Sequence, residues 1–205
     1  MSKFHFNTQQ LVQGEFKAEK ANLAFVFQVN CPGCFIYGIP MVNELYRLYK
    51  DKAGFIGVAT AFEDFEYNNE ANLKLLLHDG TLVGETKKYY HTNFQLSSYS
   101  DIPTFPVAFD RMTPSEELLY SNKIELLIDA IPNFAKYSEK EKEIIISKIR
   151  AYYSQVPLIP ETFTLNQLQG TPSFIIFDEN YNIHGSYFGH QNEAILKAKL
   201  EDLLP

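Results

Sequence analysis

The chain has 205 residues, of which 45% are hydrophobic and 21% are charged, and its formal net charge is −7. This length and composition predict one domain, residues 1–205, that buries a core and leaves room for an insertion. The negative charge argues against nonspecific nucleic-acid binding, which depends on clustered Lys and Arg. No nucleic-acid partner is therefore expected.

The N-terminal segment has no apolar core of signal-peptide length. No stretch of the chain approaches the run of about 18 apolar residues that spans a bilayer. We therefore expect a cytoplasmic protein with no membrane contact.

The chain has two cysteines, Cys31 and Cys34, and they are separated by Pro-Gly. A structural disulfide framework uses more cysteines and closes longer loops, so this spacing indicates a redox pair or half of a metal site. A zinc site needs further ligands at tetrahedral distance, whereas the five histidines are scattered along the sequence. The sequence therefore predicts a redox pair that requires no metal and no cofactor.

Apolar runs alternate with segments of helical spacing in the first half of the chain. Three of these runs predict buried strands, at 23–30, 54–60 and 105–110. Helices are expected directly after Cys31 and over 69–78, whereas residues 79–101 give no clear pattern. The order strand–helix–strand–helix–strand predicts an α/β protein with a largely parallel sheet covered by helices.

Residues 111–165 interrupt this alternation and are interpreted as a helical insertion within the domain. The segment 113–116 has the pattern of a capping box, and its helix is expected to run to about Ile131. A second capping box, at 138–141, predicts a helix towards Tyr153.

The C-terminal part is regular again. It contains an apolar strand at 173–178, a turn at Glu179-Asn180 and a second strand at 182–188 that can pair with the first as a hairpin. An amphipathic helix is expected over 191–204.

A cysteine at the start of a helix faces unpaired backbone N–H groups and the positive end of the helix dipole. Both stabilise the thiolate, which is the reactive form. Cys31 holds this place, because Pro32 suits the first helical turn. Cys34 lies one turn later on the same side, where it can attack a mixed disulfide formed at Cys31. Pro40 is expected to kink this helix.

The apolar strand, the CPGC motif, the Pro-containing helix and the downstream GTPSFIIFD segment resemble the thioredoxin superfamily, especially its TlpA-type and DsbA-type branches. The resemblance implies a thioredoxin-like fold, with a central mixed sheet flanked by helices and carrying the helical insertion. It also implies a cis-proline opposite the cysteines, and the matching positions are Thr171 and Pro172. Pro103 is rejected for this role, because no hairpin and final helix follow it.

The sequence departs from the family pattern near the cysteines. Asn30 stands where Trp is usual, and Phe25 stands where thioredoxin itself has a buried carboxylate. The proton acceptor for Cys34 is therefore not assigned, and Glu63 or Asp64 is a hypothesis for it, since both follow the neighbouring parallel strand.

Two aromatic residues follow the motif in the sequence. Phe35 is interpreted as an apolar rim that contacts substrate, and together with Thr171 and Pro172 it makes up the predicted substrate-binding set. Tyr37 is interpreted as packing.

The resemblance implies a thiol–disulfide oxidoreductase with Cys31 as nucleophile and Cys34 as resolving thiol. Its partners would be a protein or small-molecule disulfide substrate and a redox partner that resets the pair. Two alternatives stay open. One is a protein-interaction module with non-catalytic cysteines, and the other is a peroxide-reducing redoxin, although Gln28 occupies the place where a peroxiredoxin has Thr or Ser.

Overall fold

A six-stranded mixed sheet forms the centre of the computed structural model, which describes residues 2–129, 131 and 133–204. The strand order is β1-β4-β3-β2-β7-β8. The three inner strands run parallel to one another, and they are β2 (Asn22–Phe27), β3 (Gly54–Ala59) and β4 (Val107–Asp110). The outer strands are antiparallel to their neighbours, and they are β1 (Thr8–Gln13), β7 (Ser173–Phe177) and β8 (Ile183–Phe188).

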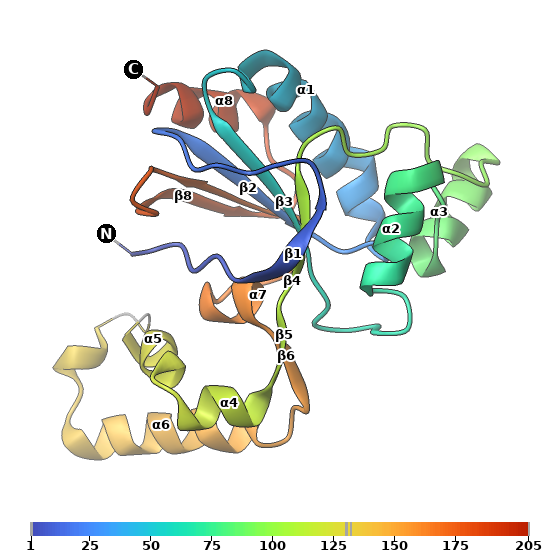
Figure 1. Ribbon diagram of the computed structural model, residues 1–205. Helices are drawn as coiled ribbons and strands as arrows, with labels where there is room; N and C mark the ends of the chain where they lie inside the picture. The colour runs from blue at the N-terminus through green and yellow to red at the C-terminus, as the bar shows by residue number, and fades with distance from the viewer. Residues whose placement is uncertain (1, 130, 132, 205) are drawn as a thin grey trace.

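Helices cover the sheet, and side chains that alternate along β2 build a core on each of its faces (Figure 1). Leu23, Phe25 and Phe27 belong to the larger core, which also takes residues from four helices. These are α1 (Ile39–Tyr49), α2 (Glu70–Asp79), α3 (Gly84–Phe94) and α8 (Glu193–Glu201). Ala24 and Val26 face the opposite core, which is closed by N-terminal phenylalanines and by α7 (Glu161–Leu165). The predicted α/β class, with a mixed sheet flanked by helices, is confirmed.

A helical segment lies between β4 and α7 and projects to one side of the sheet (Figure 1). Its stem is an antiparallel pair of short strands, β5 (Met112–Pro114) and β6 (Leu158–Pro160). Beyond the stem lie α4 (Ser115–Tyr120), α5 (Lys123–Asp129), a short 3-10 turn (Phe134–Lys136) and α6 (Glu139–Tyr153). The segment has a small apolar core of its own, formed by Leu118, Leu127, Ile159 and Leu165.

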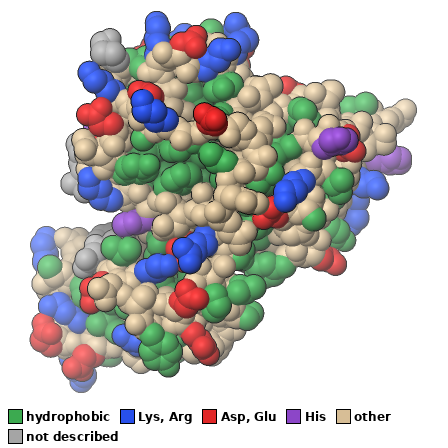
Figure 2. All heavy atoms as spheres, in the orientation of Figure 1, with side chains coloured by type: hydrophobic (Ala, Val, Ile, Leu, Met, Phe, Trp, Pro, Cys, Tyr) green, Lys and Arg blue, Asp and Glu red, His purple; other side chains and the backbone are tan. Residues whose placement is uncertain are grey.

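The outer surface of this segment carries many charged side chains, together with exposed hydrophobic ones such as Tyr120 and Tyr152. No residue of α6 is buried, and its first half alternates Glu and Lys. Figure 2 shows acidic and basic side chains interspersed over this part of the surface. Such a mixed surface favours solvation and gives no large field of a single sign.

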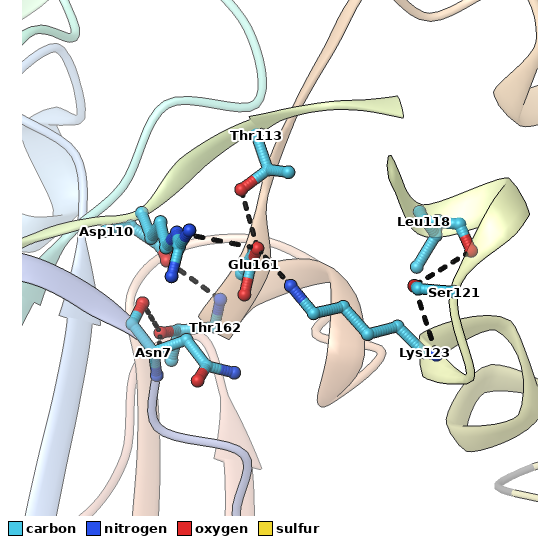
Figure 3. Close-up of polar contacts among 9 residues, drawn as sticks. Asn7, Asp110, Thr113, Leu118, Ser121, Lys123, Glu161 and Thr162 are labelled. Atoms are coloured by element: carbon cyan, nitrogen blue, oxygen red, sulfur yellow. Dashed lines mark hydrogen bonds and ion pairs between the residues drawn. The ribbon is translucent and has the colours of Figure 1, made fainter. Parts of the chain in front are cut away.

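A buried carboxylate holds the segment against the sheet domain (Figure 3). Glu161 accepts hydrogen bonds from the Thr113 hydroxyl at 2.6 Å and from the Lys123 ammonium at 2.5 Å. Arg111 adds a longer ion pair at 3.8 Å. Because Thr113 and Lys123 come from β5 and α5, this one side chain joins the stem and the helices to α7.

A second buried carboxylate, Asp110 at the end of β4, fixes α7 to the sheet. It accepts hydrogen bonds from the backbone N–H groups of Thr162 and Phe163, at 2.8 and 3.0 Å, and from the hydroxyl of Thr60 at 2.9 Å. The first turn of α7 therefore finds partners for its free donors on β4.

The capping box predicted at 113–116 is wrong. Thr113 pairs with Ile159 in the β5–β6 ladder and donates its hydroxyl to Glu161, and α4 begins after Pro114 with no side-chain cap. The helix expected to reach Ile131 is instead two helices, because Ser121 has extended backbone angles. The capping box at Ser138 is confirmed, since its side chain and that of Glu141 bond reciprocally.

Several elements were not anticipated from the sequence. β1 pairs with β4 at the edge of the sheet, α3 lies within the stretch 79–101 that gave no clear pattern, and β5, β6 and α7 lie within the stretch interpreted only as a helical insertion. In the described residues, the structure contains no helix long and apolar enough to cross a membrane.

Candidate active site

The two cysteines lie where β2 gives way to a helix. β2 ends at Phe27, and after Gln28, Val29 and Asn30 the chain reaches Cys31. Helical structure begins at Pro32, as expected for a residue without an N–H group. The backbone N–H of Cys34 donates to the carbonyl of Cys31 at 2.9 Å, which closes the first turn. The backbone N–H groups of Gly33 and Cys34 in this turn are also hydrogen-bond donors to the sulfur of Cys31.

A π-helical turn, Cys34–Gly38, separates this start from α1. The N–H of Ile39 reaches back to the carbonyl of Cys34, and Pro40 follows in the first turn of α1. Pro cannot supply the next helical hydrogen bond, so the wider turn accommodates it. Pro40 was expected to kink the helix, and the structure has a π turn directly before it.

The two thiols are free, and they occupy different environments. Cys34 is fully buried, whereas Cys31 is half-buried. A hydrogen bond from the Cys34 thiol lowers the pKa of Cys31 to about 7, against the opposing effect of burial, and the Thr171 hydroxyl and the backbone N–H groups of Cys34 and Gly33 assist. Burial raises the pKa of Cys34 well above its ordinary value, and a neighbouring Cys31 thiolate raises it further. One thiol is thus ready to react while the other keeps its proton.

Thr171 and Pro172 lie opposite the cysteines, and the peptide bond between them is cis. They precede β7, which pairs antiparallel with β2 so that Ser173 lies beside Val26. The Cys31 thiol lies within hydrogen-bonding distance of the Thr171 carbonyl, and a methyl group added to Gly33 would lie 3.8 Å from Pro172. The structure therefore brings four of the five predicted site residues together.

Phe35, the fifth, is corrected. Its side chain is 1% exposed and packs edge-on against Tyr90 and Tyr99, so it cannot contact a substrate. Tyr37, interpreted from the sequence as packing, is 44% exposed and stacks on His190. Phe35 is buried because Tyr90 and Tyr99, from a distant segment, enclose it, and sequence spacing alone did not reveal these neighbours.

The hypothesis that Glu63 or Asp64 accepts the proton of Cys34 is not supported by the contacts. The Asp64 carboxylate accepts a hydrogen bond from the side chain of Asn30 at 2.8 Å, and neither acid is among the groups that shift the pKa of Cys34. Asn30 also takes part in two more bonds, with the Asn68 side chain at 2.9 Å and the Glu85 backbone at 2.6 Å. The residue that replaces the usual Trp is therefore a buried polar link between the cysteine-bearing loop, the loop before α2 and the first turn of α3.

An open groove runs beside the motif. Residues of the cysteine-bearing helix and of the loop after β8 line it, namely Ile36, Tyr37, Pro40, Met41, His190, Gln191, Asn192 and Glu193. The groove adjoins Pro172, because the N–H of Gly189 donates to the Pro172 carbonyl at 2.8 Å. Sequence reasoning missed His190, which no motif marks.

No described group of three or more His, Cys, Asp or Glu side chains is arranged to hold a metal ion.

No family model matches the chain, and no curated protein matches it. Solved structures do. A thiol-disulfide isomerase from Corynebacterium glutamicum superposes with a TM-score of 0.59 at 21% identity, over 99% of this chain and 96% of that one. A thioredoxin-like superfamily protein gives a TM-score of 0.57 at 20% identity, over 98% of this chain and 95% of that one. The oxidised form of another thioredoxin-like protein gives a TM-score of 0.50 at 12% identity, over 98% of this chain and 92% of that one. The chain therefore has the thioredoxin-like fold that the sequence predicted.

Proposed function

We propose that this protein is a thiol–disulfide oxidoreductase that uses Cys31 as nucleophile and Cys34 as resolving thiol. The observation that carries the proposal is the difference in burial and pKa between the two free thiols. Cys31 is accessible and has a pKa of about 7, whereas Cys34 is buried with a raised pKa. The names of the similar structures include a thiol-disulfide isomerase, which agrees with this chemistry.

In the first step the Cys31 thiolate attacks one sulfur of a substrate disulfide. A bond forms between Cys31 and that sulfur, and the substrate's other sulfur leaves as a thiolate that takes a proton from water. The N–H groups of Gly33 and Cys34 stabilise the charge on Cys31 before the attack.

In the second step the Cys34 sulfur attacks the sulfur of Cys31, and the Cys34 proton passes to the substrate sulfur that leaves. The mixed disulfide breaks, the substrate leaves as a thiol, and a Cys31–Cys34 disulfide remains. The substrate has then gained two electrons, and a dithiol partner must reduce the pair for the next turnover. The same steps run in reverse when the partner is an oxidant, so the partner's potential sets the direction.

The proposed substrate is an extended segment that lies along Pro172 and in the groove beside Tyr37. The half-buried Cys31 precedes the helix that carries the exposed Tyr37, and the hydrogen bond from Gly189 connects the groove to Pro172. In this proposal the substrate disulfide lies at Cys31, and the substrate residues beside it contact Tyr37 and His190.

The test is reduction of insulin disulfides by the full-length protein with dithiothreitol as electron donor. Cys31→Ser is expected to abolish the activity, because no nucleophile remains. Cys34→Ser is expected to retain the first step and to accumulate mixed disulfides, which intact-mass measurement detects. The proposal fails if both variants reduce insulin at the rate of the parent.

The same variants separate the alternatives. An interaction module would keep its partners in both cysteine variants and lose them when the helical segment is removed. A peroxide-reducing enzyme would consume hydrogen peroxide faster than it reduces insulin, so both substrates are assayed side by side.

A further inference from the structure

Gln28 is a buried polar residue at the end of β2, three positions before Cys31. It is 2% exposed. Among the described residues, its Nε2 is the buried side-chain nitrogen or oxygen that has no hydrogen-bond partner. An unsatisfied buried donor is costly, so an apolar residue would be the more stable choice at this place. The position therefore calls for an explanation other than packing.

The other end of the same amide has a partner in the active site. Its Oε1 accepts a hydrogen bond of 3.0 Å from the hydroxyl of Thr171. Thr171 is the residue whose carbonyl faces the Cys31 sulfur, and its hydroxyl lowers the pKa of both cysteines. The backbone of Gln28 bonds the Cys34 sulfur directly, whereas its carboxamide reaches the sulfurs through one intervening side chain.

The Thr171 hydroxyl has a single proton to donate, and two acceptors compete for it. While the thiols are protonated, the hydroxyl donates to Gln28 Oε1, which lies 3.0 Å away. A thiolate is the stronger acceptor, since hydrogen bonds to charged groups are shorter and stronger than neutral ones. When Cys31 ionises, the hydroxyl proton therefore turns to the sulfur, and Gln28 Oε1 loses its donor.

The unpartnered Nε2 fits this second state. After the hydroxyl has turned, the lone pairs of Thr171 Oγ1 face Gln28 and need a donor. Rotation of the carboxamide brings Nε2 to the place of Oε1, and no bond at Nε2 has to be broken for this. The chain Gln28 N–H to Thr171 O–H to sulfur is then fully aligned, and aligned hydrogen bonds strengthen one another.

We propose that Gln28 is a positioning residue whose carboxamide turns between two orientations and so directs the Thr171 hydroxyl towards the Cys31 thiolate. This inference rests on the proposed use of Cys31 as nucleophile. It assigns Gln28 no contact with substrate, and no step of the disulfide exchange changes.

None of the other groups described around Cys31 supplies the contact that Gln28 makes through Thr171. The Cys34 thiol and the backbone N–H groups of Gly33 and Cys34 act on it directly, and no charged side chain is among the largest causes of its shift. The Asp64 carboxylate bonds the side chain of Asn30. His190 stacks on Tyr37 in the groove. Thr171 is thus the side chain, besides Cys34, through which a neighbour can tune Cys31.

The experiment titrates the Cys31 thiolate by its ultraviolet absorbance in the full-length reduced protein. Gln28→Leu is expected to raise the pKa of Cys31 by about 0.5 to 1 unit, which leaves about three- to tenfold less thiolate at a given lower pH. Thr171→Val, which removes the hydroxyl at nearly constant shape, is expected to have the same effect. The double variant is expected to shift no further than the larger single shift, because both changes break one chain of bonds.

Two further variants keep the proposal falsifiable. Gln28→Met replaces Gln28→Leu if the latter does not fold, since it keeps the length of the side chain without its donor. Thr171→Ser keeps the hydroxyl and is expected to restore the parent value. An unchanged pKa in the Gln28 variants, or shifts that add in full in the double variant, overturns the inference. The titration needs no substrate, so it tests Gln28 separately from the insulin assay, even if the parent fails to reduce insulin.

Discussion

The sulfur of Cys31 lies 3.5 Å from the carbonyl oxygen of Thr171, although 140 positions separate the two residues in the chain. A protonated thiol donates to this carbonyl, whereas a thiolate is repelled by it. The charge on Cys31 therefore depends on donors elsewhere, and the first of these is the thiol of Cys34.

Alkylation of Cys31 by iodoacetamide is expected to rise with pH around a midpoint of about 7, since the thiolate is the species that reacts and the pKa of Cys31 is about 7. Cys34→Ala removes the donating thiol and is expected to move the midpoint upward. Cys34→Ser is the matched control, because its hydroxyl still donates. Rates followed by mass spectrometry give the midpoints, and equal midpoints for the Ala and Ser variants would contradict the assignment.

Substitution of two nearby glycines by alanine is expected to change the free energy of unfolding to different extents. A methyl group on Gly38 would lie 2.5 Å from the ring of Phe25, a buried residue, whereas one on Gly33 meets Pro172 at 3.8 Å, an ordinary contact. Gly38→Ala is expected to lower the free energy of unfolding by about 1–3 kcal/mol through overpacking. Gly33→Ala is expected to leave it nearly unchanged. Urea unfolding of the two variants makes the comparison, and a reversed order would refute it.

Asp110 makes stability depend on pH, because burial raises its pKa to about 6 despite the hydrogen bonds that it accepts. A carboxyl whose pKa is higher in the folded state binds its proton more tightly there. Its contribution to stability is therefore full below the unfolded-state pKa and is lost as pH rises through about 6. The loss between about pH 4 and pH 7 is expected to be on the order of 2–3 kcal/mol.

The control for this effect is Asp110→Asn, which keeps the shape and one acceptor but cannot titrate. The free energy of unfolding of the parent minus that of the variant is expected to fall as pH rises over this range. A difference that stays constant, or grows with pH, would show that Asp110 is not the group responsible.

Lys123 is expected to matter more than other lysines of the helical segment. Its ammonium lies 2.5 Å from the buried carboxylate of Glu161, so Lys123→Met leaves that charge with the weaker partner Arg111. A loss of about 1–3 kcal/mol in the free energy of unfolding is expected. Lys148→Met, at an exposed position on α6, is the control and is expected to have little effect. Faster hydrogen exchange over residues 115–157 in Lys123→Met would show that the helical segment has lost stability. Equal exchange in both variants would contradict a stabilising contact between Lys123 and Glu161.

The sequence by itself determined five of the six strands of the sheet, all but β1, together with the helix start at Pro32 and the pairing of Cys31 with Cys34. These features depend on neighbours in the chain: apolar runs form buried strands, Pro occupies a first helical turn, and a CxxC spacing places two sulfurs on one side of a turn. The match of GTPSFIIFD to the family pattern also marked Thr171 and Pro172, because a hairpin and a closing helix follow them.

Tertiary structure decided the features that depend on distant residues. Thr113 had the pattern of a cap, yet Glu161, far along the chain, takes its hydroxyl and β6 takes its backbone. Phe35 is buried and Tyr37 is exposed, the reverse of their expected positions, because Tyr90 and Tyr99 from distant segments enclose Phe35. Gln28 gave no sign of its contact with Thr171 until β7 was placed beside β2. Hydrogen bonds between residues so far apart leave no periodic trace in a sequence, whereas burial on one face of a strand does.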